Sequence, residues 1–383
     1  MDVYLADASR TPFGRRGGIV AGLHVAQLAA VPLQQLLLRN PMLADVDHTE
    51  IYYGADPTAE SGPNLARWAG LISGLSEHYP ALTFDRRESS GLDALIFASR
   101  AIRLDDAHTV IAGAVGSSSR TGYQLAAPDH SYPASLHLTA SGNEDQVSSL
   151  LPSAWKHSAG WFAQLAAYQY GVDRALQDSW ALRSHSLAQQ AWHDGIPQEH
   201  LSYVDGHCLD ECILEEIDSR QLGGKPPLFT SDGTVTAGNS AADADGAAAL
   251  LLSAFPGPNP LATVLGGETV ALAPDDYPLA TAAAISKLLK RLNLEADDIT
   301  AWELDERYAA ATLVSLAHMP QLDKQRVNIA GSTLSYGHAG SASALRSLIN
   351  LCTVLRREGG GYGLAATSVA AGQGTAVIIR VHG

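Results

Sequence analysis

Residues 83–95 read Thr-Phe-Asp-Arg-Arg-Glu-Ser-Ser-Gly-Leu-Asp-Ala-Leu, a stretch that begins apolar, becomes polar and then turns helical. From residue 89 to residue 104, apolar and small residues recur three and four positions apart, the spacing of an amphipathic helix with a buried face. Glu88 stands directly before this pattern. The stretch therefore predicts a short strand, a tight turn and a buried helix, with a carboxylate at the helix N-terminus.

Strand and helix patterns alternate on both sides of this unit. The patterns predict further strands at residues 3–5, 50–53, 108–113, 246–252, 301–304, 327–329 and 375–381. They predict further helices at residues 28–38, 281–292 and 341–355. The order of a strand followed by a small-residue helix recurs in the last third of the chain. We therefore expect an α/β fold of two similar halves.

The middle of the chain differs in composition and in its pattern of apolar residues. Residues 118–231 carry clusters of Ser, Gly and Pro and a long helical stretch at 174–192, without a regular strand rhythm. This composition indicates an inserted lobe that is rich in loops. We therefore divide the chain into an N-terminal α/β half (1–117, completed by 232–256), the lobe and a C-terminal α/β half (257–383).

The composition excludes several classes of protein. The 383 residues are 46% hydrophobic and 17% charged, which predicts a folded chain with an ample core. The net charge of −15 disfavours nucleic acid and anionic membranes as partners. No apolar run approaches the roughly 20 residues that span a bilayer, and the N-terminus lacks the apolar region of a secretory signal. We expect no membrane association.

The three cysteines indicate a reducing compartment. Cys208, Cys212 and Cys352 are too few and too unevenly placed for a disulfide framework, so we expect a cytoplasmic protein. His207 precedes Cys208, but no second ligand pair follows at a usual zinc spacing. We expect no metal site.

Several segments carry a family resemblance that covers nearly the whole chain. The longest is Ser231-Asp-Gly-Thr-Val-Thr-Ala-Gly-Asn-Ser240, continued by Asp245-Gly-Ala-Ala-Ala249. Together with Arg10-Thr-Pro-Phe-Gly14 near the N-terminus and the stretch at 83–95, it resembles the signature regions of the thiolase superfamily, in the order of that family. The resemblance implies a thiolase-like five-layered αβαβα fold. It also implies a homodimer or a higher oligomer.

The resemblance places Glu88 where thiolases have the cysteine that becomes acylated. Ser89 and Ser90 follow it, and the helix pattern behind them is intact. The amide groups at a helix N-terminus favour a thiolate there, and they favour a carboxylate as well. The substitution therefore keeps the negative charge and removes the sulfur nucleophile.

Three further segments complete the implied site. Gly337-His338 matches the turn whose histidine binds the thioester oxygen. Trp302-Glu-Leu-Asp-Glu-Arg-Tyr-Ala-Ala310 resembles the family segment Asn-Glu-Ala-Phe-Ala, with Asp305 in place of the asparagine and Glu306 matched. Ser368 stands where the second catalytic cysteine is found, so both cysteines are replaced. If Glu88 and Asp305 converge, their repulsion should raise the pKa of one of them.

The implied site divides into two groups of residues. The catalytic candidates are Glu88, His338, Asp305 and Ser368. The candidates for substrate binding are Ser89, Ser90, Glu306, Asn239, Ser240 and Gly372. The implied substrate is an acyl thioester of coenzyme A, with no permanently bound cofactor. Because Ala241 replaces a frequent serine and the segment at 220–229 looks short, an acyl carrier protein that presents a pantetheine thioester is an alternative.

Two hypotheses of function remain open from the sequence. The first is an enzyme that forms or cleaves C–C bonds next to a thioester without an acyl-cysteine, with Glu88 as general base or orienting carboxylate. The second is a non-catalytic subunit or acyl-binding scaffold, beside an active homologous partner. A serine nucleophile is disfavoured, because no base is placed in the sequence to activate Ser89 or Ser90.

Overall fold

The structure is a computed structural model that describes residues 1–56, 60, 62–125, 138–140, 151–214 and 216–383. Its strands are β1 (Tyr4–Arg10), β2 (Gly14–Arg15), β3 (Thr49–Ala55), β4 (Ala81–Phe84), β5 (Thr109–Ser117), β6 (Tyr123–Leu125), β7 (Leu138–Ala140), β8 (Ala244–Ser253), β9 (Ala262–Ala271), β10 (Ile299–Leu304), β11 (Gly361–Val369) and β12 (Gln373–Val381). Its α-helices are α1 (Val25–Arg39), α2 (Leu65–Ser73), α3 (Ser90–Arg103), α5 (Ala159–Gln169), α6 (Arg174–His193), α7 (Ser219–Gly223), α8 (Ala280–Leu292), α9 (Ala309–Ala317), α10 (Thr333–Tyr336) and α11 (Ala342–Arg357).

The strands of both halves join in one ten-stranded sheet. Its order is β10-β11-β12-β9-β1-β8-β5-β3-β4, with β2 beside β8. In the N-terminal half, β3 runs parallel to β4 and β5. In the C-terminal half, β10 runs parallel to β11. Within this sheet, strands of the two halves pair at β1 and β9, where Tyr4 pairs with Thr263 and Leu5 pairs with Ala262.

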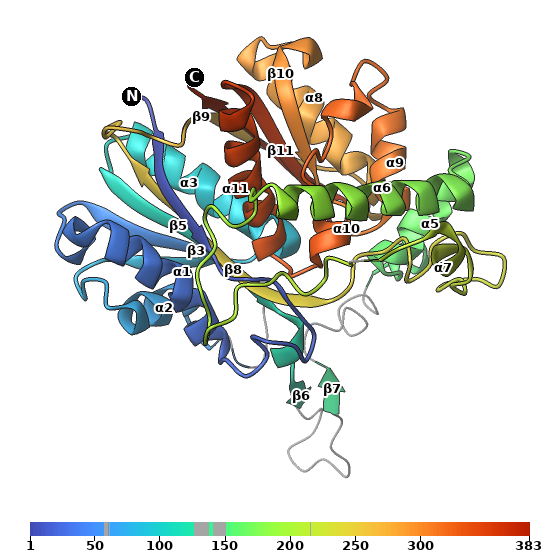
Figure 1. The fold of residues 1–383 in the computed structure, drawn as a ribbon, viewed down its shortest axis with the longest axis horizontal. Helices are drawn as coiled ribbons and strands as arrows, with labels where there is room; N and C mark the ends of the chain where they lie inside the picture. Colours follow the sequence, from blue (N-terminus) through green and yellow to red (C-terminus); the bar gives the residue numbers. More distant parts are fainter. Residues whose placement is uncertain (57–59, 61, 126–137, 141–150, 215) are drawn as a thin grey trace.

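Helices and strands alternate in five layers, as Figure 1 shows. Helices α1 and α2 cover the outer face of the N-terminal strands, and α8 covers the outer face of the C-terminal strands. Helices α3 and α11 lie between the two halves and contact each other and strands of both. The αβαβα fold expected from the sequence is confirmed, and its central helical layer carries the residues of interest at its N-terminal ends.

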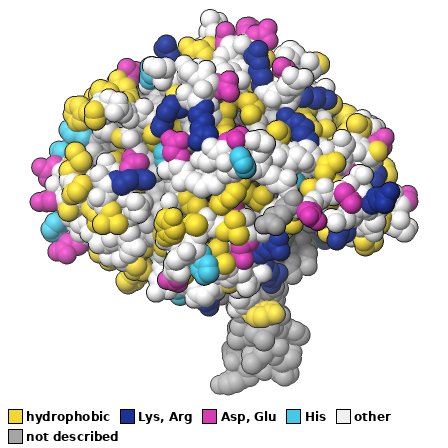
Figure 2. All heavy atoms as spheres, viewed as in Figure 1, with side chains coloured by type: hydrophobic (Ala, Val, Ile, Leu, Met, Phe, Trp, Pro, Cys, Tyr) yellow, Lys and Arg dark blue, Asp and Glu magenta, His cyan; other side chains and the backbone are white. Residues whose placement is uncertain are grey.

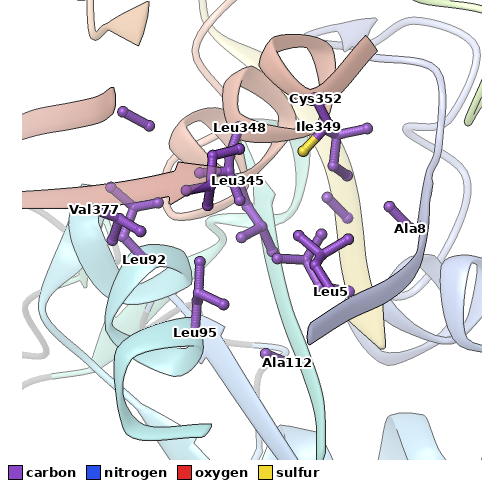
Figure 3. Close-up of a cluster of buried hydrophobic side chains, with 14 of the residues drawn as sticks. Leu5, Ala8, Leu92, Leu95, Ala112, Leu345, Leu348, Ile349, Cys352 and Val377 are labelled. Carbon is purple, nitrogen blue, oxygen red and sulfur yellow. The ribbon is translucent and has the colours of Figure 1, made fainter. Parts of the chain in front are cut away.

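The largest buried cluster lies in this central layer (Figure 3). Leu92 and Leu95 of α3 face Leu345 and Leu348 of α11, and all four side chains are fully buried. Full burial of such a side chain stabilises the fold by about 1.5–3 kcal/mol. Gly91 permits the close approach of α3 and α11, because a Cβ atom there would lie 2.6 Å from the Ser341 carbonyl oxygen.

Most elements agree with the sequence patterns, and one strand does not. The prediction of a strand at 327–329 is wrong, because only Val327 forms an isolated bridge, to Trp302. Asn328 has a left-handed backbone (φ +52°), and its side chain bonds the backbone N–H and C=O of Leu304. A residue in that conformation leaves the extended ladder.

In its described residues, the proposed lobe contains the helices α5, α6 and α7 and the paired strands β6 and β7. Helix α6 agrees with the helical stretch expected at 174–192, and α5 and α7 lie on either side of it in the chain. Strands β6 and β7 pair in a separate two-stranded sheet. Parts of the lobe, including 126–137 and 141–150, lie outside the described residues, and the domain division stays a prediction.

A buried ion pair ties β1 to the end of the lobe. Both Nη atoms of Arg10 bond the Asp210 carboxylate, at 2.8 and 2.7 Å, and neither side chain is exposed. Asp210 also accepts the backbone N–H of Phe13. The pair fixes the conformation of the segment that the sequence analysis recognised at residues 10–14.

The surface carries no continuous basic stripe on the face that Figure 2 draws. Lys and Arg side chains on that face are scattered among acidic and apolar ones. Within the described residues, no helix is both long enough and apolar enough to cross a membrane. The expected exclusion of nucleic acid stays a prediction.

The turn between β11 and β12 contains a strained alanine. Ala371 has φ +64° and is exposed, and Gly372 follows it with φ +77°. A left-handed conformation costs a residue with a Cβ about 1–2 kcal/mol, and glycine avoids this cost but loses about 0.5–1 kcal/mol of chain entropy. Ala371→Gly is therefore expected to raise the free energy of unfolding in urea by about 0.5–1 kcal/mol. Ala370→Gly, one residue earlier, is the control and is expected to lower it.

Candidate active site

Glu88 lies at the entrance to helix α3. It belongs to a short 3₁₀ turn, η2 (Arg87–Ser89), and its side chain is buried. Gly54 at the end of β3 allows this turn to come close, because a Cβ atom there would lie 2.4 Å from the Ser90 carbonyl carbon. The carboxylate thus sits where the helix N-terminus favours a negative charge.

Two basic side chains face this carboxylate. Arg307 Nη1 donates a hydrogen bond to Glu88 Oε1, and His338 Nε2 lies 3.8 Å from the same oxygen. Arg307 follows β10 and His338 follows α10, so distant parts of the chain meet here. Within the described residues, Glu88 Oε2 and His338 Nδ1 are buried and have no hydrogen-bond partner. A bound water or a ligand would supply the hydrogen bonds that these two atoms lack.

The charges around Glu88 determine its protonation. Burial opposes ionisation, but the positive charge of Arg307, with that of Arg87, outweighs burial and lowers the pKa of Glu88. The carboxylate is therefore anionic at neutral pH and binds protons weakly. A weak proton acceptor is suited to orienting other groups rather than to removing a proton from carbon.

His338 is held by the backbone of the neighbouring strand. Its N–H donates to Ala242 O at 2.7 Å, and its C=O accepts the N–H of Ala244 at 3.0 Å. Gly337 has φ +89°, which suits glycine at this turn. Burial lowers the pKa of His338 to about 3, with a further contribution from Arg307. The imidazole is neutral at pH 7 and carries one N–H that can donate to an oxygen.

Asp305 and Ser368 also lie near Arg307. Together with Arg307 they line one narrow interior gap. Asp305 Oδ1 accepts Thr333 Oγ1 at 2.5 Å and Oδ2 accepts Thr367 Oγ1 at 3.3 Å, so both oxygens are bonded by hydroxyl groups. Burial raises the pKa of Asp305, and the Glu88 carboxylate adds to this. The expected repulsion between the two carboxylates thus raises the pKa of Asp305, while Arg307 keeps Glu88 ionised.

The two serines after Glu88 form hydrogen bonds within the turn and the first turn of α3. Ser89 Oγ donates to Asp93 Oδ2 at 3.0 Å. Ser90 Oγ donates to Arg87 O at 2.7 Å and accepts the N–H of Arg86, also at 2.7 Å. Both hydroxyl groups therefore stabilise the backbone around Glu88. Their expected contact with a substrate stays a prediction.

Glu306 has a structural role, because its carboxylate is bonded by other side chains of the protein. Its carboxylate is fully buried and accepts hydrogen bonds from Trp180 Nε1 (2.7 Å), Ser184 Oγ (2.6 Å) and Asn328 Nδ2 (2.7 Å). Three donors satisfy it within the protein. Glu306 thus joins α6 to the segment after β10, and the structure does not place it beside Glu88.

Asn239 and Gly372 also have structural roles, in that each stabilises or permits the local conformation of the backbone. Asn239 Nδ2 donates to Asp178 Oδ1 at 2.8 Å and to Thr234 O at 3.0 Å. Gly372 turns the chain between β11 and β12, and a Cβ atom there would lie 2.4 Å from Ala273 O. Neither residue lies among the groups that meet at Glu88.

Ser240 lines a separate pocket, whose wall is apolar for the larger part. The pocket has a volume of about 650 Å³, and Arg15, Arg220 and Lys225 also line it. Ser240 Oγ is buried without a partner among the described residues. Three cationic side chains around one pocket suit a ligand that carries phosphate groups.

Two residues at the site were missed by the sequence analysis, Arg307 and Asp56. Arg307 occupies the third position of the segment compared with Asn-Glu-Ala-Phe-Ala, and its charge there was the available signal. Asp56 follows β3, and Glu88 follows the parallel neighbour β4, so both carboxylates lie at the same edge of the sheet. Ligands of α/β sheets bind at that edge, which was the signal for Asp56.

The described residues contain no candidate metal site. No group of three or more His, Cys, Asp or Glu side chains there could hold a metal ion. Cys212 and Cys352 are buried, and Cys208 is half-buried. The expected absence of a metal stays a prediction.

Comparisons with known proteins agree with the fold. The family descriptions "Thiolase, N-terminal domain" and "Thiolase, C-terminal domain" match residues 3–254 and 258–381. The chain is 34% identical over 401 aligned positions to a β-ketoadipyl-CoA thiolase of Pseudomonas knackmussii, with 99% of each chain covered. It is 32% identical over 398 positions to the 3-oxoadipyl-CoA/3-oxo-5,6-dehydrosuberyl-CoA thiolase of Escherichia coli K12, again with 99% of each covered.

Solved structures give the same result. Human mitochondrial 3-ketoacyl-CoA thiolase matches with a TM-score of 0.92 at 26% identity, covering 100% of this chain and 99% of that one. The acetyl-CoA acetyltransferase of Bacillus anthracis matches with a TM-score of 0.89 at 29% identity, covering 99% and 98%. The chain therefore belongs to the thiolase family.

Proposed function

We propose that this protein acts on an acyl thioester, in the formation or cleavage of a C–C bond, without an acyl-cysteine intermediate. The observation that carries the proposal is the cluster at Glu88, in which Arg307 and His338 meet a carboxylate at the helix N-terminus. The relatives include several CoA thiolases, which supports a CoA thioester as substrate.

The positions of the cysteines support a noncovalent reaction. The chain has three cysteines. Cys352 lies in α11 within the core drawn in Figure 3, and Cys208 and Cys212 lie in the segment before α7. Glu88 and Ser368 occupy the two positions that the family resemblance assigns to catalytic cysteines. A carboxylate paired with arginine is a poor nucleophile, so we expect no acyl-enzyme.

A neutral histidine supports chemistry through an enolate. Removal of a proton from the carbon next to a thioester carbonyl leaves negative charge on the carbonyl oxygen, and hydrogen-bond donors stabilise that charge. His338 supplies one N–H, and its other nitrogen is unpartnered among the described residues. We assign His338 the role of donor to this oxygen and Glu88 the role of a fixed anion.

The pocket beside Ser240 supports binding of the carrier arm. Arg15, Arg220 and Lys225 line it, and Ser240 forms an isolated bridge with Tyr308, the residue after Arg307. Ser240 therefore lies beside the segment that carries Arg307. We propose that the pocket holds the phosphate-bearing end of coenzyme A, with a carrier-protein pantetheine as the alternative.

Hydrogen exchange tests this function directly. The protein is incubated with acetyl-CoA in D₂O, deuterium in the acetyl group is followed by mass spectrometry, and the intact protein is weighed in parallel. We expect exchange about 10²–10⁴-fold above the buffer reaction, the contribution typical of one general base, and an unchanged protein mass. An acetyl adduct on the protein would contradict the noncovalent mechanism.

A non-catalytic scaffold is the second candidate function. It is favoured by one observation, the ion pair between Glu88 and Arg307, which occupies the position of the family nucleophile. In the same experiment a scaffold binds acetyl-CoA, as measured by calorimetry, and gives no exchange above buffer. The homodimer, a heteromeric active partner and a cytoplasmic location remain predictions from the resemblance and the composition.

A further inference from the structure

The pocket beside Ser240 contains a second buried polar group, the imidazole of His185 in α6. His185 lines the pocket and is 5% exposed, and its Nδ1 atom has no hydrogen-bond partner among the described residues. The Ser240 hydroxyl lines the same pocket and lacks a partner in the same part of the chain. A ligand or a water in the pocket would supply the hydrogen bonds that both side chains lack.

The pocket is connected to the cluster at the helix N-terminus through the residues after Ser240. The N–H of Ala241 donates to the Arg307 carbonyl oxygen at 2.9 Å, and the N–H of His338 donates to the Ala242 carbonyl oxygen at 2.7 Å. Ala242 also lines the pocket. The segment that borders the pocket is therefore bonded directly to Arg307 and to His338.

Hydrogen bonds fix helix α6 against the same part of the protein. Ser184, the residue before His185, donates to Glu306 Oε2 at 2.6 Å, and Trp180 Nε1 donates to Oε1 at 2.7 Å. Glu306 directly precedes Arg307 in the chain. The buried carboxylate thus holds α6, and with it His185, at a fixed position relative to Arg307.

The pocket is charged at its exposed end and largely apolar inside. Arg220 and Lys225 are exposed, whereas Leu222, Leu334 and His185 are buried. Burial lowers the pKa of His185 to about 4, so the imidazole is neutral at pH 7 and has one N–H donor and one acceptor nitrogen. A ligand that fits has an anionic end and an apolar chain with groups that donate and accept hydrogen bonds.

Pantetheine has this chemistry. It is the arm that coenzyme A and acyl carrier proteins share, with a phosphate at one end, the thioester at the other and amide groups in the chain between them. An amide presents an N–H donor and a carbonyl acceptor, which a hydroxyl and a neutral imidazole complement. Phosphate oxygens favour charged donors instead, and the exposed cations supply these.

We propose that His185 and Ser240 recognise an amide group of the pantetheine arm and determine the specificity for a pantetheine thioester, an inference that rests on the proposed function. One of the two side chains donates to the amide carbonyl oxygen, and the other accepts the amide N–H. Arg220 and Lys225 contact the phosphate at the exposed end. The amide contacts are the same for acyl-CoA and for an acyl carrier protein, since both present this arm.

Calorimetry with the full-length protein tests this recognition. His185→Phe keeps a ring and removes both nitrogens, and it should weaken binding of acetyl-CoA and of S-acetylpantetheine about 10–100-fold each, because a buried amide loses its partner. His185→Gln has both a donor and an acceptor and should recover most of the affinity. His193→Phe is the matched control on α6, and its side chain is 87% exposed, so the affinities should not change.

Two further ligands show which part of the substrate is recognised. Adenosine bisphosphate, the nucleotide end of coenzyme A without the arm, should bind His185→Phe as well as it binds the wild type, and Lys225→Ala should weaken its binding. Equal losses for this nucleotide and for the thioesters in His185→Phe would overturn the recognition of the arm. An acyl carrier protein charged with an acetyl group is measured beside acetyl-CoA, and the tighter ligand identifies the source of the arm.

The outcomes separate this inference from the proposed function. If the wild type binds neither acetyl-CoA nor the charged carrier protein, the proposed function is overturned. Unchanged thioester affinities in His185→Phe overturn only the recognition of the amide. If His185→Phe does not fold, as judged by circular dichroism, Ser240→Ala decides. A weaker affinity for the thioesters and an unchanged one for the nucleotide then support the inference, and unchanged thioester affinities reject it.

Discussion

His338→Ala is expected to lower the rate of deuterium exchange into acetyl-CoA by about 10²–10³-fold, the usual cost of losing one donor to a developing oxyanion. The buried imidazole is neutral, so its single N–H is the group that stabilises the enolate oxygen. Binding of acetyl-CoA should change little, since this contact strengthens only as the charge develops. Exchange rate and calorimetric affinity, measured together, check the prediction.

The matched control is His318→Ala. His318 is exposed at the end of α9, and its loss should leave the exchange rate unaltered. Because the pKa of His338 lies at about 3, titration of this imidazole should not affect the wild-type rate within about one pH unit of neutrality. A parallel loss of affinity and rate in His338→Ala would indicate a binding residue instead.

Asp210→Ala is expected to lower the free energy of unfolding by about 3–5 kcal/mol, the largest stability effect we foresee. The substitution leaves the Arg10 guanidinium charged and buried and removes the acceptor of the Phe13 N–H. Urea unfolding followed by circular dichroism measures the change.

Two further variants show whether the burial of the pair is the cause. Asp243→Ala breaks an exposed contact, in which Arg16 lies 3.8 Å away, and should change stability by about 0.5 kcal/mol or less. The double variant Arg10→Met with Asp210→Leu removes both charges and should recover much of the loss. Equal losses in Asp210→Ala and Asp243→Ala would refute the role of burial.

Local sequence patterns predicted elements that have a clear periodicity. Helix α3 follows the three-and-four spacing of its apolar residues, and β8 follows its continuous apolar run. Strand β9 escaped prediction, since Gly266 and Gly267 interrupt its apolar pattern. The segment at 327–329 looked extended, but the left-handed Asn328 ends any ladder there.

The site was predictable only in part, for a physical reason. The family resemblance gave the positions of Glu88 and His338, and the structure brings them within 3.8 Å. Arg307 lies 219 residues from Glu88 in the chain, and no local pattern records an ion pair across that distance. The environment of Asp56 likewise depends on groups from three separate elements. Long-range electrostatics of this kind arises only when the fold is complete.

The central position of β1 has a consequence for how the chain folds. Tyr4 pairs with Ser253 of β8 and with Thr263 of β9, so the earliest strand finds its neighbours only after most of the chain has been made. Contacts between residues so far apart in the sequence slow folding. Until they form, apolar strands stay unpaired. During synthesis, the N-terminal half is therefore expected to depend on chaperones until β8 emerges from the ribosome.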